Sequence, residues 1–255
     1  SSDLVIDFAD MPLEAAMRWP KTLDHIRSTV KVERDESKNL AVEERWWLFG
    51  SRVPDMRAAT ANLRRFPAVA GTAKRLLIAW QYPPTLPNNA CYVFAFDDDF
   101  SMGILLSHAH EAWAWAVSST LETRLRYTNT SVFERFPWPD PVTDTQREAV
   151  ADACIALLDR RSEICTNEAI GLTTLNNRLD EGAYTDLKAL HKALDEAVAA
   201  AYDWPKSIAQ DTDEVVRRLA ALNAEIAAGS RPYAPFPDVA RPDGQLSLVE
   251  DLTET

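Results

Sequence analysis

The sequence has few of the residues that several kinds of binding site require. Glycine occurs only 7 times among 255 residues and forms no phosphate-binding loop. The 3 cysteines, Cys91, Cys154 and Cys165, are too few for a disulfide framework and too widely spaced for a zinc knuckle, which fits a reducing compartment. No apolar run approaches the roughly 18 residues that a membrane helix needs. We therefore expect a cytoplasmic protein that has no contact with a membrane.

Catalytic and metal-binding motifs are also scarce. The sequence contains neither a Gly-x-Ser-x-Gly elbow nor the Asx-Pro-Pro-aromatic tetrapeptide of amino methyltransferases. His108 and His110 would point apart on a helix, so we expect hydrogen-bonded histidines of a buried helix there rather than a metal site. The run 97–99, Asp-Asp-Asp, lacks the glycine and the later glutamate of a calcium loop. It is expected to end a strand and cap the next helix.

The net charge of −12 argues against a polyanionic partner, but the charge is unevenly distributed. Residues 31–135 carry 13 Lys or Arg and 12 Asp or Glu, whereas residues 136–255 carry 11 and 22. Residues 56–96 hold no acid and five cations: Arg57, Arg64, Arg65, Lys74 and Arg75. This middle part can bind a polyanion, with the acidic excess on a separate C-terminal part. The alternative is an ordinary solvated face.

Hydrophobic periodicity and turn residues divide the chain into a mixed first part and a helical second part. Short helices are predicted first, at 12–17, 21–30, 42–49 and 54–63, with a loop at 31–40. Two strands follow at 76–80 and 91–96, on either side of a proline-rich loop, and then one long buried helix at 101–119. After the rigid segment Phe136-Pro137-Trp138-Pro139, helices are predicted at 143–161, 162–170, 183–202 and 211–228.

Residues 121–130, Leu-Glu-Thr-Arg-Leu-Arg-Tyr-Thr-Asn-Thr, combine side chains that can read DNA. Arginine recognises guanine edges, asparagine recognises adenine, glutamate accepts from cytosine, and hydroxyl groups bind phosphate. Arg124, Arg126 and Asn129 are therefore candidates for base contacts. The alternative is a polar surface loop in which the arginines pair with nearby acids.

The segment Arg45-Trp46-Trp47-Leu48-Phe49-Gly50, followed by Arg52-Val53-Pro54, resembles a signature of the MmeI-like enzymes. These are the fused type IIG/IIL restriction–modification proteins and their methyltransferase relatives in phage-defence systems. Further segments resemble the family in the same order along the chain, at 5–8, 98–113, 118–128, 133–139 and 187–205. The resemblance spans roughly residues 4–228.

The resemblance implies an α+β chain with four parts. Residues 1–40 would be a linker with helices that follows a catalytic domain, and residues 41–139 a mixed α/β target recognition domain with a small sheet. Residues 140–228 would form an all-α helical domain, and residues 229–255 an extended tail. The implied function is recognition of a short duplex DNA sequence, so that a neighbouring domain can methylate adenine at N6 with S-adenosylmethionine. Because the catalytic and cofactor motifs would lie upstream, this chain alone is expected to be inactive and to bind no cofactor.

The expected partners are double-stranded DNA, the methyltransferase catalytic domain and other subunits of a defence system. Phosphate contacts are expected from Arg64, Arg65, Lys74 and Arg75, and Tyr127 joins Arg124, Arg126 and Asn129 in the predicted DNA-binding set. Two other functions stay open. One is an acidic helical scaffold that binds a defence partner without reading DNA. The other is a metal hydrolase built around His108 and His110.

Overall fold

The structure, a computed structural model, describes residues 4–50, 53–118, 120–121 and 124–236. The chain forms two compact units, residues 1–59 and residues 60–255, and each has its own hydrophobic core. Within the described residues, no helix is long and apolar enough to cross a membrane.

The N-terminal unit is helical. It contains α1 (Leu13–Ala16), α2 (Pro20–Arg34), α3 (Leu40–Glu44) and most of α4 (Pro54–Thr60). Pro20 begins α2 at the position where a missing N–H costs no helical hydrogen bond. The helix continues to Arg34, so the loop predicted at 31–40 is shorter than expected.

The paired tryptophans hold this unit together. Trp46 is buried in the core, and the Trp47 indole N–H donates to the carbonyl oxygen of Met11 over 2.8 Å. Arg34, in the last turn of α2, donates to the carbonyl oxygens of Trp46, at 3.0 Å, and Leu48. Both rings therefore serve the packing of the N-terminal unit.

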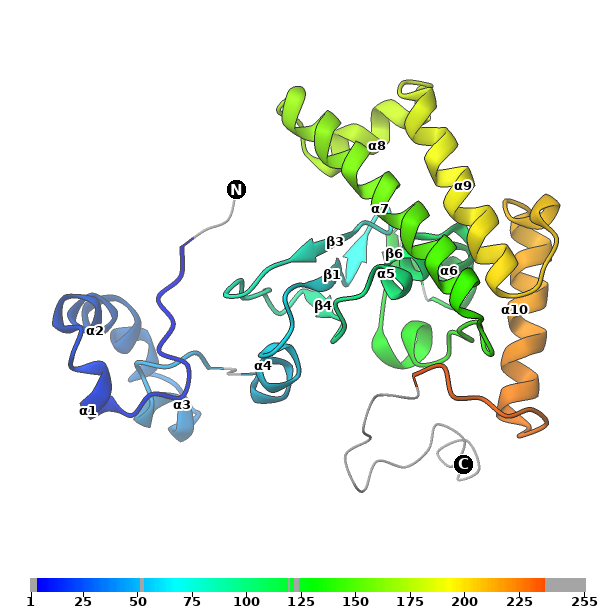
Figure 1. The fold of residues 1–255 in the computed structure, drawn as a ribbon. Coiled ribbons are helices and arrows are strands. Elements are labelled where there is room, and N and C mark those ends of the chain that lie inside the picture. Colours follow the sequence, from blue (N-terminus) through cyan, green and yellow to red (C-terminus); the bar gives the residue numbers. More distant parts are fainter. Residues whose placement is uncertain (1–3, 51–52, 119, 122–123, 237–255) are drawn as a thin grey trace. The chain divides into compact units, whose positions relative to one another are not determined.

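Two small antiparallel sheets lie in the second unit (Figure 1). The first has the order β3 (Ile78–Gln81), β1 (Phe66–Ala70), β4 (Cys91–Val93). The second has the order β2 (Thr72–Ala73), β6 (Arg124–Arg126), β5 (Thr120–Leu121). Only Gly71 separates β1 from β2, so one continuous stretch of chain belongs to both sheets.

Helices make up the rest of the second unit. They are α5 (Asp99–Leu106), α6 (His108–Val117), α7 (Asp144–Asn167), α8 (Leu172–Asp180), α9 (Thr185–Ala201) and α10 (Thr212–Ala227). Two short helices, the π-helix η1 (Asn129–Phe133) and the 3-10 helix η2 (Lys206–Ile208), lie in the connections. The helix α7 packs against α5 and α9, and α10 packs against α6.

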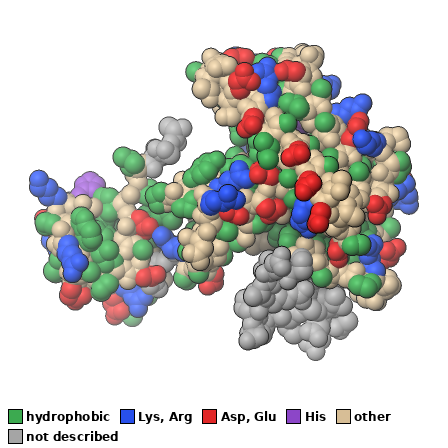
Figure 2. Space-filling model, in the orientation of Figure 1, with side chains coloured by type: hydrophobic (Ala, Val, Ile, Leu, Met, Phe, Trp, Pro, Cys, Tyr) green, Lys and Arg blue, Asp and Glu red, His purple; other side chains and the backbone are tan. Residues whose placement is uncertain are grey.

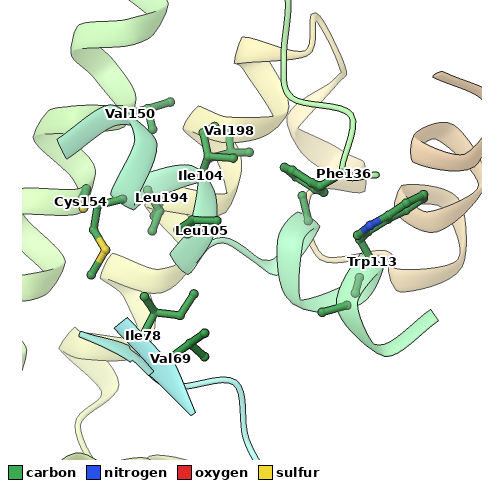
Figure 3. Close-up of a cluster of buried hydrophobic side chains, with 14 of the residues drawn as sticks. Val69, Ile78, Ile104, Leu105, Trp113, Phe136, Val150, Cys154, Leu194 and Val198 are labelled. Carbon is green, nitrogen blue, oxygen red and sulfur yellow. The ribbon is translucent and has the colours of Figure 1, made fainter. Parts of the chain in front are cut away.

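A single core joins the first sheet to these helices (Figure 3). Val69 and Ile78 project from the sheet toward the side chains that α5, α7 and α9 contribute to the same cluster. The α+β class expected from the sequence is therefore confirmed.

In the second unit, the helices differ from the predicted ones at three places. The single helix predicted at 101–119 is wrong, because Ser107 is extended and separates α5 from α6. Its hydroxyl group donates to the carbonyl oxygen of Ile104 over 2.7 Å and accepts from the His110 N–H over 3.4 Å, so it offers the backbone partners other than helical ones. The two helices predicted at 143–161 and 162–170 are one helix, α7, which starts at a capping box of Thr143 and Gln146. The helix α8 was not predicted.

The compact units are larger than the four predicted parts. The predicted boundaries after residues 40, 139 and 228 stay predictions, whereas the contacts divide the chain once, after residue 59. The reason is that α5 and α6, which precede residue 139, pack against α7 and α10, which follow it.

Gly103 provides a test of the packing between α5 and α7. A Cβ atom at this position would lie 2.8 Å from Val150 Cγ1 and 3.2 Å from both Cys154 Cβ and the Val150 carbonyl oxygen. We expect Gly103→Ala to lower the free energy of unfolding by about 1–3 kcal/mol, because the backbone oxygen and Cβ cannot move aside. Gly50→Ala, at a position with open space around it, is the control. Urea denaturation of both variants measures the difference, and equal stabilities would contradict the close approach.

Candidate nucleic-acid interface

The strand β6 has one face in the core and one face in solvent. Leu125 and Tyr127 are buried, with 2% and 1% of their surface exposed, whereas Arg124 and Arg126 are exposed. This alternation follows from strand geometry, in which successive side chains point to opposite faces. The two arginines therefore point away from the core.

The neighbouring strand β2 adds to this outer face. Thr72 pairs with Arg126 and Ala73 with Leu125, and continuing the register by one residue brings Lys74 opposite Arg124. Thr72 and Lys74 are exposed. We call Thr72, Lys74, Arg124 and Arg126 the β2–β6 face.

The three cations of the β2–β6 face have no anionic partner among the described residues. No hydrogen bond or ion pair of the Lys74, Arg124 or Arg126 side chains occurs within this part of the chain. Within the described residues, nothing therefore occupies these three cations.

Asn129 lies close to this face along the chain. Its backbone carbonyl accepts the N–H of Glu134 over 2.8 Å, which fixes it at the start of η1, and its side chain is exposed. The Thr128 hydroxyl caps the same turn by accepting the N–H of Ser131 over 3.2 Å. The amide of Asn129 is thus presented to solvent from an ordered backbone.

The backbone of Gly71 forms hydrogen bonds with two other segments beside the β2–β6 face. Its carbonyl accepts the N–H of Tyr127 over 2.9 Å, and its N–H donates to the carbonyl of Ala90 over 2.7 Å. A Cβ at Gly71 would lie 3.0 Å from Tyr92 Cε2 and 3.2 Å from the Ala90 oxygen, so glycine suits this close approach. The loop 82–90 ends here and exposes Tyr82 and Asn89. Sequence reasoning did not select this loop or Thr72, although both lie in the acid-free stretch 56–96.

The other predicted phosphate contacts come from arginines that already have partners. Arg64 forms an ion pair with Asp97 at 3.1 Å, and Arg75 pairs with Asp180 of α8. Arg65 donates to Asp99 over 2.7 Å, and its guanidinium lies 4.0 Å from the centre of the Trp80 ring. Phosphate contacts from these three arginines remain predictions, and each would have to compete with a carboxylate of the protein.

Tyr127 does not belong to the exposed set. The prediction that its side chain contacts DNA is corrected here, because the ring is buried. Its hydroxyl group lies 3.1 Å from His110 Nε2, and the other ring nitrogen of His110 lies 2.9 Å from the carbonyl oxygen of Leu105. The Tyr127 hydroxyl and the His110 ring therefore both have hydrogen-bond partners inside the protein.

The two histidines considered for a metal site make separate hydrogen bonds. His108 Nε2 lies 3.1 Å from the Thr212 hydroxyl, while His110 faces Tyr127. Among the described residues, no group of three or more His, Cys, Asp or Glu side chains could hold a metal ion.

Acids and cations are interspersed over the visible face of the helical part (Figure 2). Many arginines there bind nearby acids, as Arg160 binds Glu163 and Asp186. This local pairing contrasts with the β2–β6 face, whose cations have no ion pair within the part of the chain that the structure describes.

These features define an α+β module whose small second sheet exposes cations that have no ion pair among the described residues. A family model described as the MmeI target recognition domain matches residues 5–140, which is more than half of the chain. The chain therefore belongs to the MmeI target recognition domain family, and the resemblance read from the sequence is confirmed.

Two individual proteins are similar to this chain. DNA methyltransferase A of Bacillus subtilis (strain 168) is 31% identical over 118 residues, which cover 46% of this chain and 13% of that protein. The solved structure of the type IIL restriction–modification enzyme MmeI in complex with DNA has the same fold, with a TM-score of 0.63 and 20% identity. That likeness covers 84% of this chain and 28% of the MmeI chain. The chain thus spans only a minor part of either protein.

The buried His110 predicts a pH dependence of stability. Burial lowers its pKa to about 4 in the folded protein, from about 6.5 in an unfolded chain. The unfolded state therefore binds more protons between these values, so the free energy of unfolding should decrease as the pH falls from about 6.5 to about 4. The contribution of His110 is at most about 3 kcal/mol.

Comparison with His110→Gln isolates this effect from other titrations. Burial raises the pKa of Asp195 to about 6, which acts in the opposite direction, but it does so in both proteins. We expect the variant to lose less stability than the wild type between pH 6.5 and pH 4 in denaturant titrations. Identical pH slopes would show that His110 is protonated without penalty in the fold.

Proposed function

We propose that this chain is the sequence-reading part of a bacterial adenine-specific (N6) DNA methyltransferase of restriction–modification or phage-defence type. The single observation that carries this proposal is the alternation along β6, which turns Arg124 and Arg126 outward from the core, where neither has an ion pair among the described residues. Family membership supports the same function.

In this proposal the β2–β6 face enters the major groove of duplex DNA. A two-stranded antiparallel ribbon fits that groove, where each base pair presents a distinct set of donors and acceptors. Arg124 and Arg126 would donate to guanine edges, and Asn129 would pair with adenine. Lys74 would bind backbone phosphate, which adds affinity without sequence information.

The chemistry belongs to another part of the assembled enzyme. A methyltransferase catalytic domain would bind S-adenosylmethionine and transfer its methyl group, while this chain supplies the target sequence. The catalytic domain is therefore a proposed partner, together with other subunits of a defence system. The proposed location is the cytoplasm. This division of labour is supported by the small share of the two similar proteins that the chain covers.

Two single substitutions on the β2–β6 face, with a control on α9, test the roles of its cations. Arg126→Ala should lower affinity for the preferred duplex by about 1–3 kcal/mol and relax its sequence preference, because a base contact is lost. Lys74→Ala should weaken all duplexes alike and lower the slope of log K against log salt concentration by about 1. Lys188→Ala removes an exposed cation from α9 and should change neither property.

The preferred duplex is first obtained by letting the wild-type chain select from a random pool, and Kd is then measured at several salt concentrations. Equal losses on the selected and a random duplex for Arg126→Ala would remove it from the base-reading set. A wild-type chain that binds no duplex at low salt would contradict the proposed function itself.

A further inference from the structure

The second sheet is too small to fix its own position. Its strands β2, β6 and β5 have only two, three and two residues. Strands this short offer few backbone hydrogen bonds, and a shift of one residue would exchange their two faces. Such a shift in β6 would turn Arg124 and Arg126 into the core. Something outside the sheet must therefore hold the strand in register.

A buried hydrogen-bond chain reaches β6 from the helices. A carbonyl oxygen only accepts, so the His110 nitrogen at 2.9 Å from the Leu105 oxygen, Nδ1, must carry the proton. The other nitrogen, Nε2, is then an acceptor and receives the Tyr127 hydroxyl proton over 3.1 Å. Burial keeps the pKa of His110 near 4, so this one tautomer persists near neutral pH.

This series of hydrogen bonds connects three parts of the second unit. Leu105 lies in α5, His110 in α6, and Tyr127 directly after β6. The Tyr127 backbone N–H also donates to Gly71, between the two sheets. The Tyr127 ring is 6.1 Å from the Tyr92 ring of the first sheet, measured between centroids.

The Tyr127 hydroxyl forms a directional contact, whereas packing of the ring alone would not fix the register of β6. Leu125 also faces inward, but apolar packing depends on area and hardly on orientation. A hydrogen bond requires both a distance and an angle. In addition, an unpaired hydroxyl or imidazole nitrogen in this interior would be costly, which disfavours any register that separates the two groups.

We infer that His110 and Tyr127 are positioning residues for DNA reading: their hydrogen bond fixes β6 so that Arg124 and Arg126 face outward in a single register. The inference rests on the proposed function, and neither residue touches DNA. His110 and Tyr127 affect sequence discrimination indirectly, because they position the two arginines.

Tyr127→Phe is the principal test, because it keeps the ring and removes only the hydroxyl. Tyr92→Phe is the matched control. It removes the same atom from the adjacent ring, whose hydroxyl has no hydrogen-bond partner among the described residues. His110→Gln is the conservative replacement, since its amide can donate to Leu105 and accept from Tyr127. His110→Leu can do neither.

Two readouts are measured on the full chain. In binding, Tyr127→Phe and His110→Leu should lose about tenfold in the ratio of affinities for the selected and a random duplex, while Tyr92→Phe and His110→Gln keep it. Affinity for random duplex should stay unchanged in all four variants. Without DNA, amide hydrogens of residues 124–127 should exchange about tenfold faster in the first two variants than in the second two.

Several outcomes would overturn the inference. Equal discrimination and equal exchange in Tyr127→Phe and Tyr92→Phe would show that the hydroxyl group does not position β6. Equal losses on selected and random duplex would indicate general destabilisation, as would loss of folding in His110→Gln. If the wild-type chain selects no sequence, the proposed function fails, and the inference about reading fails with it. Faster exchange in Tyr127→Phe would then show only that the bond orders the strand.

Discussion

Burial of Leu125 and Tyr127 is the constraint on which the candidate interface depends. Each large apolar side chain gains about 1.5–3 kcal/mol when it leaves water, and both project from the same side of one short strand. Because side chains alternate along a strand, placing these two inside requires Arg124 and Arg126 to lie outside. Once β6 is held in this register, the exposure of the two arginines follows from the packing of their neighbours.

Pairing of charges explains how a protein with a net charge of −12 can present a cationic face. Carboxylates of the chain occupy the cations that lie near them, including Arg64, Arg65 and Arg75. These ion pairs reduce the positive potential around each arginine, and the more exposed ones add little stability. The β2–β6 face is left with Lys74, Arg124 and Arg126 unpaired among the described residues. The electrostatic potential at this face depends on nearby charges, so the net charge of the whole protein does not predict it.

Local patterns in the sequence predicted part of this arrangement. The helical second half and the Asp98 cap of α5 depend on neighbours in the chain. The base-reading role of residues 124–129 stays a prediction. What could not be predicted depends on distant partners. Arg75 meets Asp180, which is 105 residues away, and Tyr127 meets His110 of α6, which is 17 residues away. Tyrosine is common both in interfaces and in cores, so its residue type alone could not distinguish these roles. The break at Ser107 was missed because a single serine inside an apolar helix gives little warning of an extended backbone.

Photo-cross-linking of a duplex to the full chain, followed by mapping of the linked peptides, tests the central claim most directly. If the β2–β6 face reads DNA, the cross-links should fall on residues 72–74 and 124–129, and excess salt should abolish them. Cross-links confined to α7–α10, or a pattern that does not change when Arg124 and Arg126 are replaced by alanine, would contradict that claim.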